Sequence, residues 1–145
     1  MKVQARRYSK RILIADDDSV MRHLLIAIVK KEGYEAVAVG DGREAFRLLQ
    51  SDADFSAAIF DMMMPHLTGL DIIRYMRTEK RLQRIPVMMI SAEQDLHLMA
   101  RSFVAGVRAF LSKPCNAEQI ESTLRILLTP ASIPQTLRPN RHVAA

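Results

Sequence analysis

The stretch RILIADDD, residues 11–18, joins a short apolar run to three consecutive aspartates. The run holds only Ile, Leu and Ala, a pattern typical of a strand that is buried on both faces of a sheet. The abrupt change at Asp16 indicates that this strand ends at a polar edge. In parallel sheets such an edge, beyond the carboxyl ends of the strands, is where ligands bind.

The same pattern recurs along the chain, with short apolar runs that alternate with segments of helical periodicity. The predicted strands are Arg11–Ala15, Glu35–Val39, Ala57–Phe60, Val87–Ile90 and Ala109–Leu111. The predicted helices are Ser19–Glu32, a helix opened by Asp41, one from Thr68 to about Arg77, one from about Asp95 to Gly106, and one from Asn116 to about Leu128. Five strands alternating with five helices predict an α/β fold, a doubly wound parallel sheet covered on both faces.

Three of these helices are predicted to start at a capping box, in which two polar residues three positions apart cap each other's backbone N–H groups. The pairs are Asp41 with Glu44, Thr68 with Asp71, and Asn116 with Gln119.

The charge of the chain is distributed unevenly. Over all 145 residues the formal net charge is +5, which taken alone suggests an anionic partner such as nucleic acid. Residues 1–11 hold five Lys or Arg and no acid, and residues 129–145 hold two Arg and no acid, whereas residues 12–128 hold 14 basic and 16 acidic residues. We therefore divide the sequence into a basic N-terminal arm, 1–9, a mildly acidic domain, 10–128, and a Pro-containing, mobile C-terminal tail, 129–145.

Several classes of protein are excluded or disfavoured by composition. Cys115 is the only cysteine, which excludes an intrachain disulfide and a cysteine-based zinc site. The apolar runs are far shorter than the roughly 18–20 residues of a membrane span, and too short for a signal peptide. Aromatic residues make up 6% of the chain and Trp is absent, which disfavours a stacking surface for nucleic acid. We expect a cytoplasmic protein with no membrane partner.

Polar side chains follow four of the five predicted strands, where the carboxyl ends of parallel strands meet. They are Asp16 and Asp17, Asp61, Ser91 and Lys113. Carboxylates crowded at one edge repel one another and need a cation, and oxygen ligands completed by water suit Mg²⁺. A carboxylate beside Mg²⁺ and a lysine is arranged to accept a phosphoryl group, because both cations neutralise oxygens on the transferring group.

The segment from about Lys10 to Leu128 resembles the receiver domain of two-component response regulators, the CheY-like superfamily. The matching residues are Asp16–Asp17, Asp61 within FDMMMP at 60–65, Gly69-Leu70, Ser91-Ala92 and Lys113-Pro114. The resemblance implies a flavodoxin-like sheet with strand order 2-1-3-4-5. It also implies a phosphoacceptor in phosphorelay signal transduction rather than an enzyme.

The resemblance implies a role for each carboxylate. Asp61 would accept a phosphoryl group from a phosphohistidine on a sensor histidine kinase or a phosphotransfer protein. Mg²⁺ would be held by the side chains of Asp16, Asp17 and Asp61 together with the backbone carbonyl of Met63. Asp18 is the surplus aspartate, which we expect to cap the following helix or to be solvated.

The resemblance also implies a switch. Lys113, before a proline bond that is commonly cis in this family, would contact the phosphoryl group. Ser91 would move to hydrogen-bond it, and Phe110 would turn inward behind Ser91. The surface of the fourth helix, fifth strand and fifth helix would then bind a downstream protein partner.

Two other functions stay open. The first is a Mg²⁺-dependent phosphohydrolase with Asp61 as nucleophile, although the residue two positions later is Met63 rather than an acid. The second is a DNA-binding protein that uses its basic ends, although nucleic acid is not the partner we expect. The sequence also leaves a homodimer open.

Overall fold

The computed structural model describes residues 10–129, which form one parallel five-stranded sheet in the order β2-β1-β3-β4-β5. The strands are β1 (Arg11–Ala15), β2 (Glu35–Val39), β3 (Ala57–Asp61), β4 (Val87–Ser91) and β5 (Ala109–Ser112). The helices are α1 (Ser19–Lys31), α2 (Gly42–Ser51), α3 (Gly69–Thr78), α4 (Lys80–Gln83), α5 (Leu96–Ala105) and α6 (Ala117–Leu128). The predicted doubly wound fold and its strand order are confirmed.

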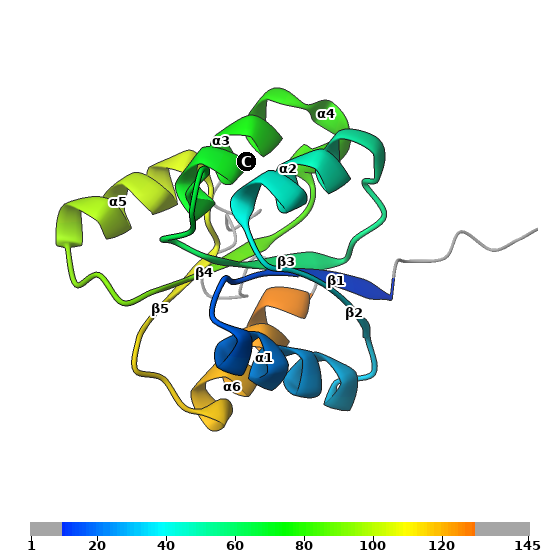
Figure 1. Ribbon diagram of the computed structural model, residues 1–145, viewed down its shortest axis with the longest axis vertical. Helices are drawn as coiled ribbons and strands as arrows, with labels where there is room; N and C mark the ends of the chain where they lie inside the picture. Colours follow the sequence, from blue (N-terminus) through cyan, green and yellow to red (C-terminus); the bar gives the residue numbers. More distant parts are fainter. Residues whose placement is uncertain (1–9, 130–145) are drawn as a thin grey trace, which may run out of the picture.

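The helices cover both faces of the sheet, as Figure 1 shows, with α1 and α6 on one face and α2 to α5 on the other. Alternate residues of each strand supply the two core layers, because successive side chains point to opposite faces. In β1, Leu13 and Ala15 belong to the layer under α2 to α5, whereas Ile12 and Ile14 belong to the layer over α1 and α6. The central strands β3 and β4 are buried along their whole length.

The number of helices differs from the prediction, because the one-turn helix α4 adds a sixth helix to the five expected. Glu79 has an extended backbone, with φ −114° and ψ 115°, and both ends α3 and precedes α4. Four residues are too few to show a helical period in the sequence. The position of α4 instead reflects tertiary packing, since its Leu82 is fully buried in the core.

The helix starts agree with the predicted caps at two of the three sites. Capping boxes form at Thr68 with Asp71 and at Asn116 with Gln119. The box predicted at Asp41 is wrong in one half: the Asp41 side chain accepts from the Glu44 N–H, but the Glu44 carboxylate accepts from the Gly40 N–H, at 3.3 Å. Glu44 thus reaches one residue beyond the helix cap and holds Gly40, the first residue after β2.

Two predicted segments fall outside the described part of the chain: the basic arm, 1–9, and nearly all of the tail, residues 130–145. Among the helices within residues 10–129, none is both long enough and apolar enough to cross a membrane.

Candidate functional site

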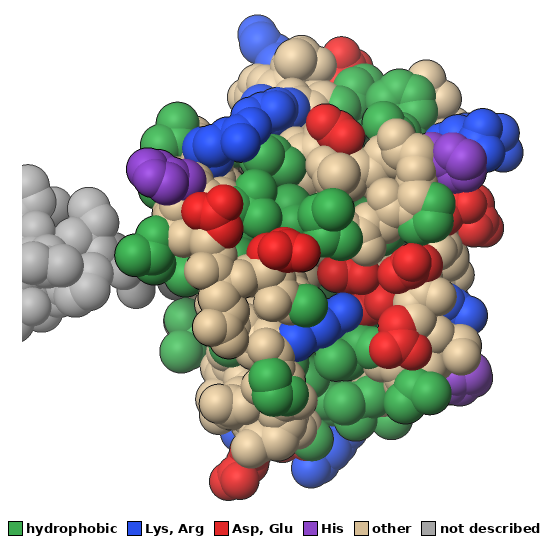
Figure 2. Space-filling model, turned by 60° about the vertical axis from the view of Figure 1, so that its left-hand side comes forward, with side chains coloured by type: hydrophobic (Ala, Val, Ile, Leu, Met, Phe, Trp, Pro, Cys, Tyr) green, Lys and Arg blue, Asp and Glu red, His purple; other side chains and the backbone are tan. Residues whose placement is uncertain are grey.

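Three carboxylates meet at the carboxyl ends of the two neighbouring strands β1 and β3. Asp16 and Asp17 follow β1 directly, and Asp61 is the last residue of β3. One oxygen of each lies within 4.8 Å of the others. Figure 2 brings this edge of the sheet forward and shows acidic side chains gathered across it, with a basic side chain beside them. The parallel register therefore brings together residues that are 44 or more positions apart in the chain.

Asp16 is the carboxylate whose surroundings best fit a bound cation. Its side chain is fully buried, and its Oδ1 accepts from the Asp18 N–H at 2.9 Å. Its Oδ2 has no hydrogen-bond partner within the described residues. Burial raises the pKa of Asp16, although the Asp18 N–H and the charge of Lys113 oppose the shift. The Lys113 ammonium faces this oxygen at 3.7 Å, too far for a hydrogen bond, so a metal ion would supply a closer contact for a carboxylate that is costly to bury.

Asp61 is only 6% exposed, and it lies in a similarly unfavourable place for a negative charge. Burial first, and then repulsion from Asp16, raise the pKa of Asp61 to about 7, while Lys113 and the Met63 N–H act in the opposite direction. Near neutral pH this carboxyl group is therefore divided between its protonated and anionic forms. A cation bound at the cluster would favour the anion, which is the nucleophilic form.

Lys113 reaches the carboxylates from the far side of β4. Its backbone N–H donates to the Ser91 carbonyl at 2.7 Å, which ties the end of β5 to the end of β4. Its Nζ lies 3.5 Å from Asp61 Oδ1 and 3.7 Å from Asp16 Oδ2. The Lys113–Pro114 peptide is cis, as expected. One ammonium group therefore serves a cluster of three carboxyl groups, and it lies within 4 Å of two of them.

Ser91 and Phe110, the two predicted switch residues, lie on the neighbouring strands. Ser91 is fully buried, and its Oγ accepts from the Glu93 N–H at 3.0 Å. Phe110 is half-buried on β5 and packs against the core layer under α2 to α5. Its ring centroid is 6.4 Å from that of Phe103 on α5. The structure thus connects Phe110 to α5 by an aromatic contact, which the sequence did not predict.

Met63 and Asp18 complete the set of predicted residues. The Met63 backbone N–H donates to the Asp61 carboxylate, and its side chain is 51% exposed. Asp18 lies outside the cluster of three carboxylates and caps α1 by accepting from the Val20 N–H at 2.9 Å. The cap expected for the surplus aspartate is confirmed.

Two contacts at this edge were not predicted from the sequence. Arg22 of α1 donates from Nη1 to the Asp16 carbonyl at 2.8 Å, which holds the turn that carries the first carboxylates. A Cβ on Gly69 would lie 2.7 Å from the Asp61 carbonyl and 2.6 Å from the Met89 sulfur, so α3 can approach the end of β3 only because this residue is glycine. The contact explains why Gly69 belongs to the motif, a role that its spacing alone does not show.

The family model for the response regulator receiver domain matches residues 12–125. Chemotaxis protein CheY1 of Helicobacter pylori is 31% identical over 119 residues, which cover 81% of this chain and 96% of that protein. Chemotaxis protein CheY of Pseudomonas aeruginosa is 32% identical over 115 residues, which cover 79% and 92%. The structure of the chemotaxis response regulator CheY4 of Vibrio cholerae matches with a TM-score of 0.76 at 28% identity, and covers 83% of this chain and 99% of that one. The chain therefore belongs to the response regulator receiver domains of two-component signalling systems.

Proposed function

We propose that this protein is a phosphoacceptor in which Asp61 takes a phosphoryl group from the phosphohistidine of a sensor histidine kinase or a phosphotransfer protein. The observation that carries the proposal is the position of Asp61, buried at the end of β3 beside a lysine and two further carboxylates. An Asp61 oxygen would attack phosphorus as the P–N bond to the donor breaks, and the electron pair of that bond would remain on the imidazole. The product is an acyl phosphate on Asp61.

Mg²⁺ is the cofactor that the site fits. The side chains of Asp16, Asp17 and Asp61 and the backbone carbonyl of Met63 would hold it. The buried Oδ2 of Asp16, which has no hydrogen-bond partner among the described residues, supports this assignment. An all-oxygen donor set with room for water suits a hard divalent cation. When bound, Mg²⁺ would neutralise oxygens of the phosphoryl group.

Lys113 and Ser91 would hold the phosphoryl group once it is attached. Lys113 is already within 4 Å of the accepting carboxylate, so its ammonium can pair with a phosphoryl oxygen after a small movement. The Ser91 hydroxyl would turn from the Glu93 N–H toward the new oxygens. Phe110 would then move inward and, through its contact with Phe103, change the position of α5.

The surface that reports this change would be formed by α5, β5 and α6. It corresponds to the predicted fourth helix, fifth strand and fifth helix, because α4 shifts the numbering by one. We propose that this α5–β5–α6 surface binds a downstream protein partner in the cytoplasm when Asp61 is phosphorylated.

The direct test is incubation with Mg²⁺ and acetyl phosphate, followed by intact-mass spectrometry. We expect the mass of one phosphoryl group per chain, none when the metal is removed with EDTA, and NMR shifts at Phe110 and along α6 with beryllofluoride. Absence of both the label and the shifts would refute the proposal. Continuous release of phosphate from a phosphate ester, dependent on Asp61, would favour the phosphohydrolase instead.

The raised pKa of Asp61 predicts how Mg²⁺ affects stability. An aspartate has a pKa near 3.8 in the unfolded chain and Asp61 about 7 in the folded one, so the folded state binds more protons between these values. The free energy of unfolding should therefore fall as pH rises from about 4 to about 7, and the loss should persist above pH 7. Mg²⁺ binds the anionic cluster, so it should stabilise the protein more at pH 8 than at pH 5, where protons compete with it.

Urea unfolding at both pH values, with and without Mg²⁺, measures this effect. At a Mg²⁺ concentration roughly ten times Kd, the stabilisation at pH 8 should be about 1.4 kcal/mol. Asp18→Asn, which lies outside the cluster, should keep the full response. An equal response at pH 5 and pH 8 would contradict a metal site built on these carboxylates.

A further inference from the structure

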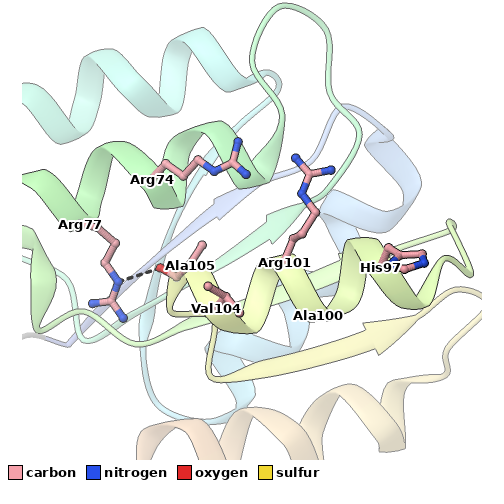
Figure 3. Close-up of a pocket in the computed structure, with 7 residues that line it drawn as sticks. All are labelled: Arg74, Arg77, His97, Ala100, Arg101, Val104 and Ala105. Carbon is pink, nitrogen blue, oxygen red and sulfur yellow. Dashed lines mark hydrogen bonds between the residues drawn. The ribbon is translucent and has the colours of Figure 1, made fainter.

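A groove of about 530 Å³ runs between α3 and α5, and none of the residues of the carboxylate site lines it. Figure 3 shows the groove, with Arg74 and Arg77 from α3 on one side and α5 on the other. Its lining residues are Arg74, Arg77, His97, Ala100, Arg101, Val104 and Ala105. None of these residues belongs to β5 or α6, so the groove shares only α5 with the α5–β5–α6 surface.

The groove is basic and its charges are not neutralised by the protein. No acidic residue lines it. Arg74 and Arg101, which Figure 3 shows extending into the space between the helices, make no hydrogen bond or ion pair with any residue in 10–129. Unpaired arginines around one concave surface attract carboxylates, to which the guanidinium group can donate two hydrogen bonds.

The groove also exposes apolar surface. Along α5, polar and apolar side chains form two separate rows. Val104, one of the lining residues, is 88% exposed although it is aliphatic. Ala100 and Val104 are four residues apart, as are His97 and Arg101, so each pair lies one turn apart on adjacent strips of the helix. A polar row beside an apolar row over about two turns matches an amphipathic helix with acidic residues at the same spacing.

The groove is held in shape without a ligand. Arg77 donates from Nε to the Ala105 carbonyl at 2.8 Å, so it attaches the end of α5 to α3. Gly106 ends α5 with φ 113°, and a Cβ there would overlap the Arg77 guanidinium. A groove that is already formed loses less conformational freedom when a ligand binds.

We propose that the α3–α5 groove binds an acidic amphipathic helix of a partner protein. Carboxylates one turn apart would pair with Arg74 and Arg101, while apolar side chains would cover Ala100 and Val104. Nucleic acid fits this surface less well, because the lining has no Phe, Tyr or Trp on which bases could stack and its apolar row would face phosphates. The proposal does not depend on phosphorylation of Asp61.

The test uses the full chain without phosphodonor and a short fluorescein-labelled helix that carries glutamate on one face and leucine on the next. A matched peptide has glutamine in place of every glutamate. We expect the acidic peptide to bind, and the glutamine peptide to bind at least about tenfold more weakly. Added salt should weaken the binding of the acidic peptide, because it screens the charge contacts. Measuring fluorescence anisotropy before any phosphorylation keeps this result independent of the function of Asp61.

Variants of the protein test whether the acidic peptide binds in the α3–α5 groove. Arg74→Gln with Arg101→Gln should weaken binding about tenfold, because two charge contacts are lost. The control pair Lys30→Gln with Lys31→Gln removes the same charge from α1, on the opposite face of the sheet, and should change Kd less than about twofold. Val104→Asp should also weaken binding, whereas Ile126→Asp, at a 73% exposed position on α6, should not.

Four results would overturn the proposal. They are no binding of the acidic peptide, equal binding of the glutamine peptide, equal losses in the groove and control pairs, and tighter binding of a mixed-sequence DNA duplex that depends on Arg74 and Arg101. The last result would assign the groove to nucleic acid. Equal melting temperatures of the variants, expected because all the changed side chains are exposed, exclude unfolding as the cause.

Discussion

Replacement of Asp61 by Asn is expected to abolish phosphoryl labelling of this protein. The amide has nearly the same shape but no anionic oxygen to attack phosphorus, so labelling should fall by on the order of 10³-fold or more. Of the carboxylates in the cluster, Asp61 has its side chain closest to the Lys113 ammonium, at 3.5 Å. Intact-mass spectrometry after incubation with acetyl phosphate and Mg²⁺ measures the change.

Asp61→Asn should remain folded, and this separates a chemical role from a structural one. The pKa of Asp61 is raised because burial and Asp16 disfavour its charge, so a neutral side chain relieves repulsion. The free energy of unfolding at pH 8 without metal should therefore equal or exceed that of the unchanged protein. Asp18→Asn is the matched control and should be labelled normally, because Asn also caps helices. Persistent labelling of Asp61→Asn would place the phosphoryl group elsewhere.

Replacement of Phe60 by Ala should cause the largest loss of stability, about 3–5 kcal/mol. Phe60 is fully buried on the central strand β3. It lies opposite Ala15 of β1 and Met89 of β4, so the residues around it are held on both sides and cannot easily fill the cavity. Because domains are commonly stable by about 5–15 kcal/mol, this variant should retain only part of its stability. Urea unfolding at pH 7 measures the difference.

Phe103→Ala provides the matched control, since it removes the same atoms from a side chain that is 45% exposed on α5. The free energy of unfolding should fall by less than about 1 kcal/mol in this variant, mostly because the ring contact with Phe110 is lost. A cost for Phe60→Ala no larger than that for Phe103→Ala would show that the layer under α2 to α5 is not the main core.

The strands were predictable because each is a short apolar run with a sharp polar end. The predicted and observed strands differ only where Asp61, Ser91 and Ser112 extend the pairing by one residue. The helix α4 was not predictable, since Leu82 holds it by packing rather than by a repeated pattern. The reach of Glu44 to Gly40 was also not predictable, because a capping motif specifies the residue types and not the rotamer.

The carboxylate site, like the fold, has features that the sequence predicts and others that only the structure shows. Sequence alone determined which residues meet at the edge, because the parallel order brings the carboxyl ends of β1, β3, β4 and β5 together. Only the tertiary structure decided that Asp16 Oδ2 lacks a hydrogen-bond partner among residues 10–129 and that the pKa of Asp61 is raised to about 7. Both depend on burial and on charges from distant parts of the chain.

The amino-acid sequence therefore determined the α/β fold and the residues of the carboxylate site, because apolar runs with polar ends mark the strands and the edge where they meet. The strand order was implied by the resemblance to receiver domains and not by those local patterns. The tertiary structure decided the groove between α3 and α5, with its unpaired Arg74 and Arg101 and its exposed Val104. A groove exists only where two helices far apart in sequence pack at a particular distance, and no pattern within either helix specifies that distance.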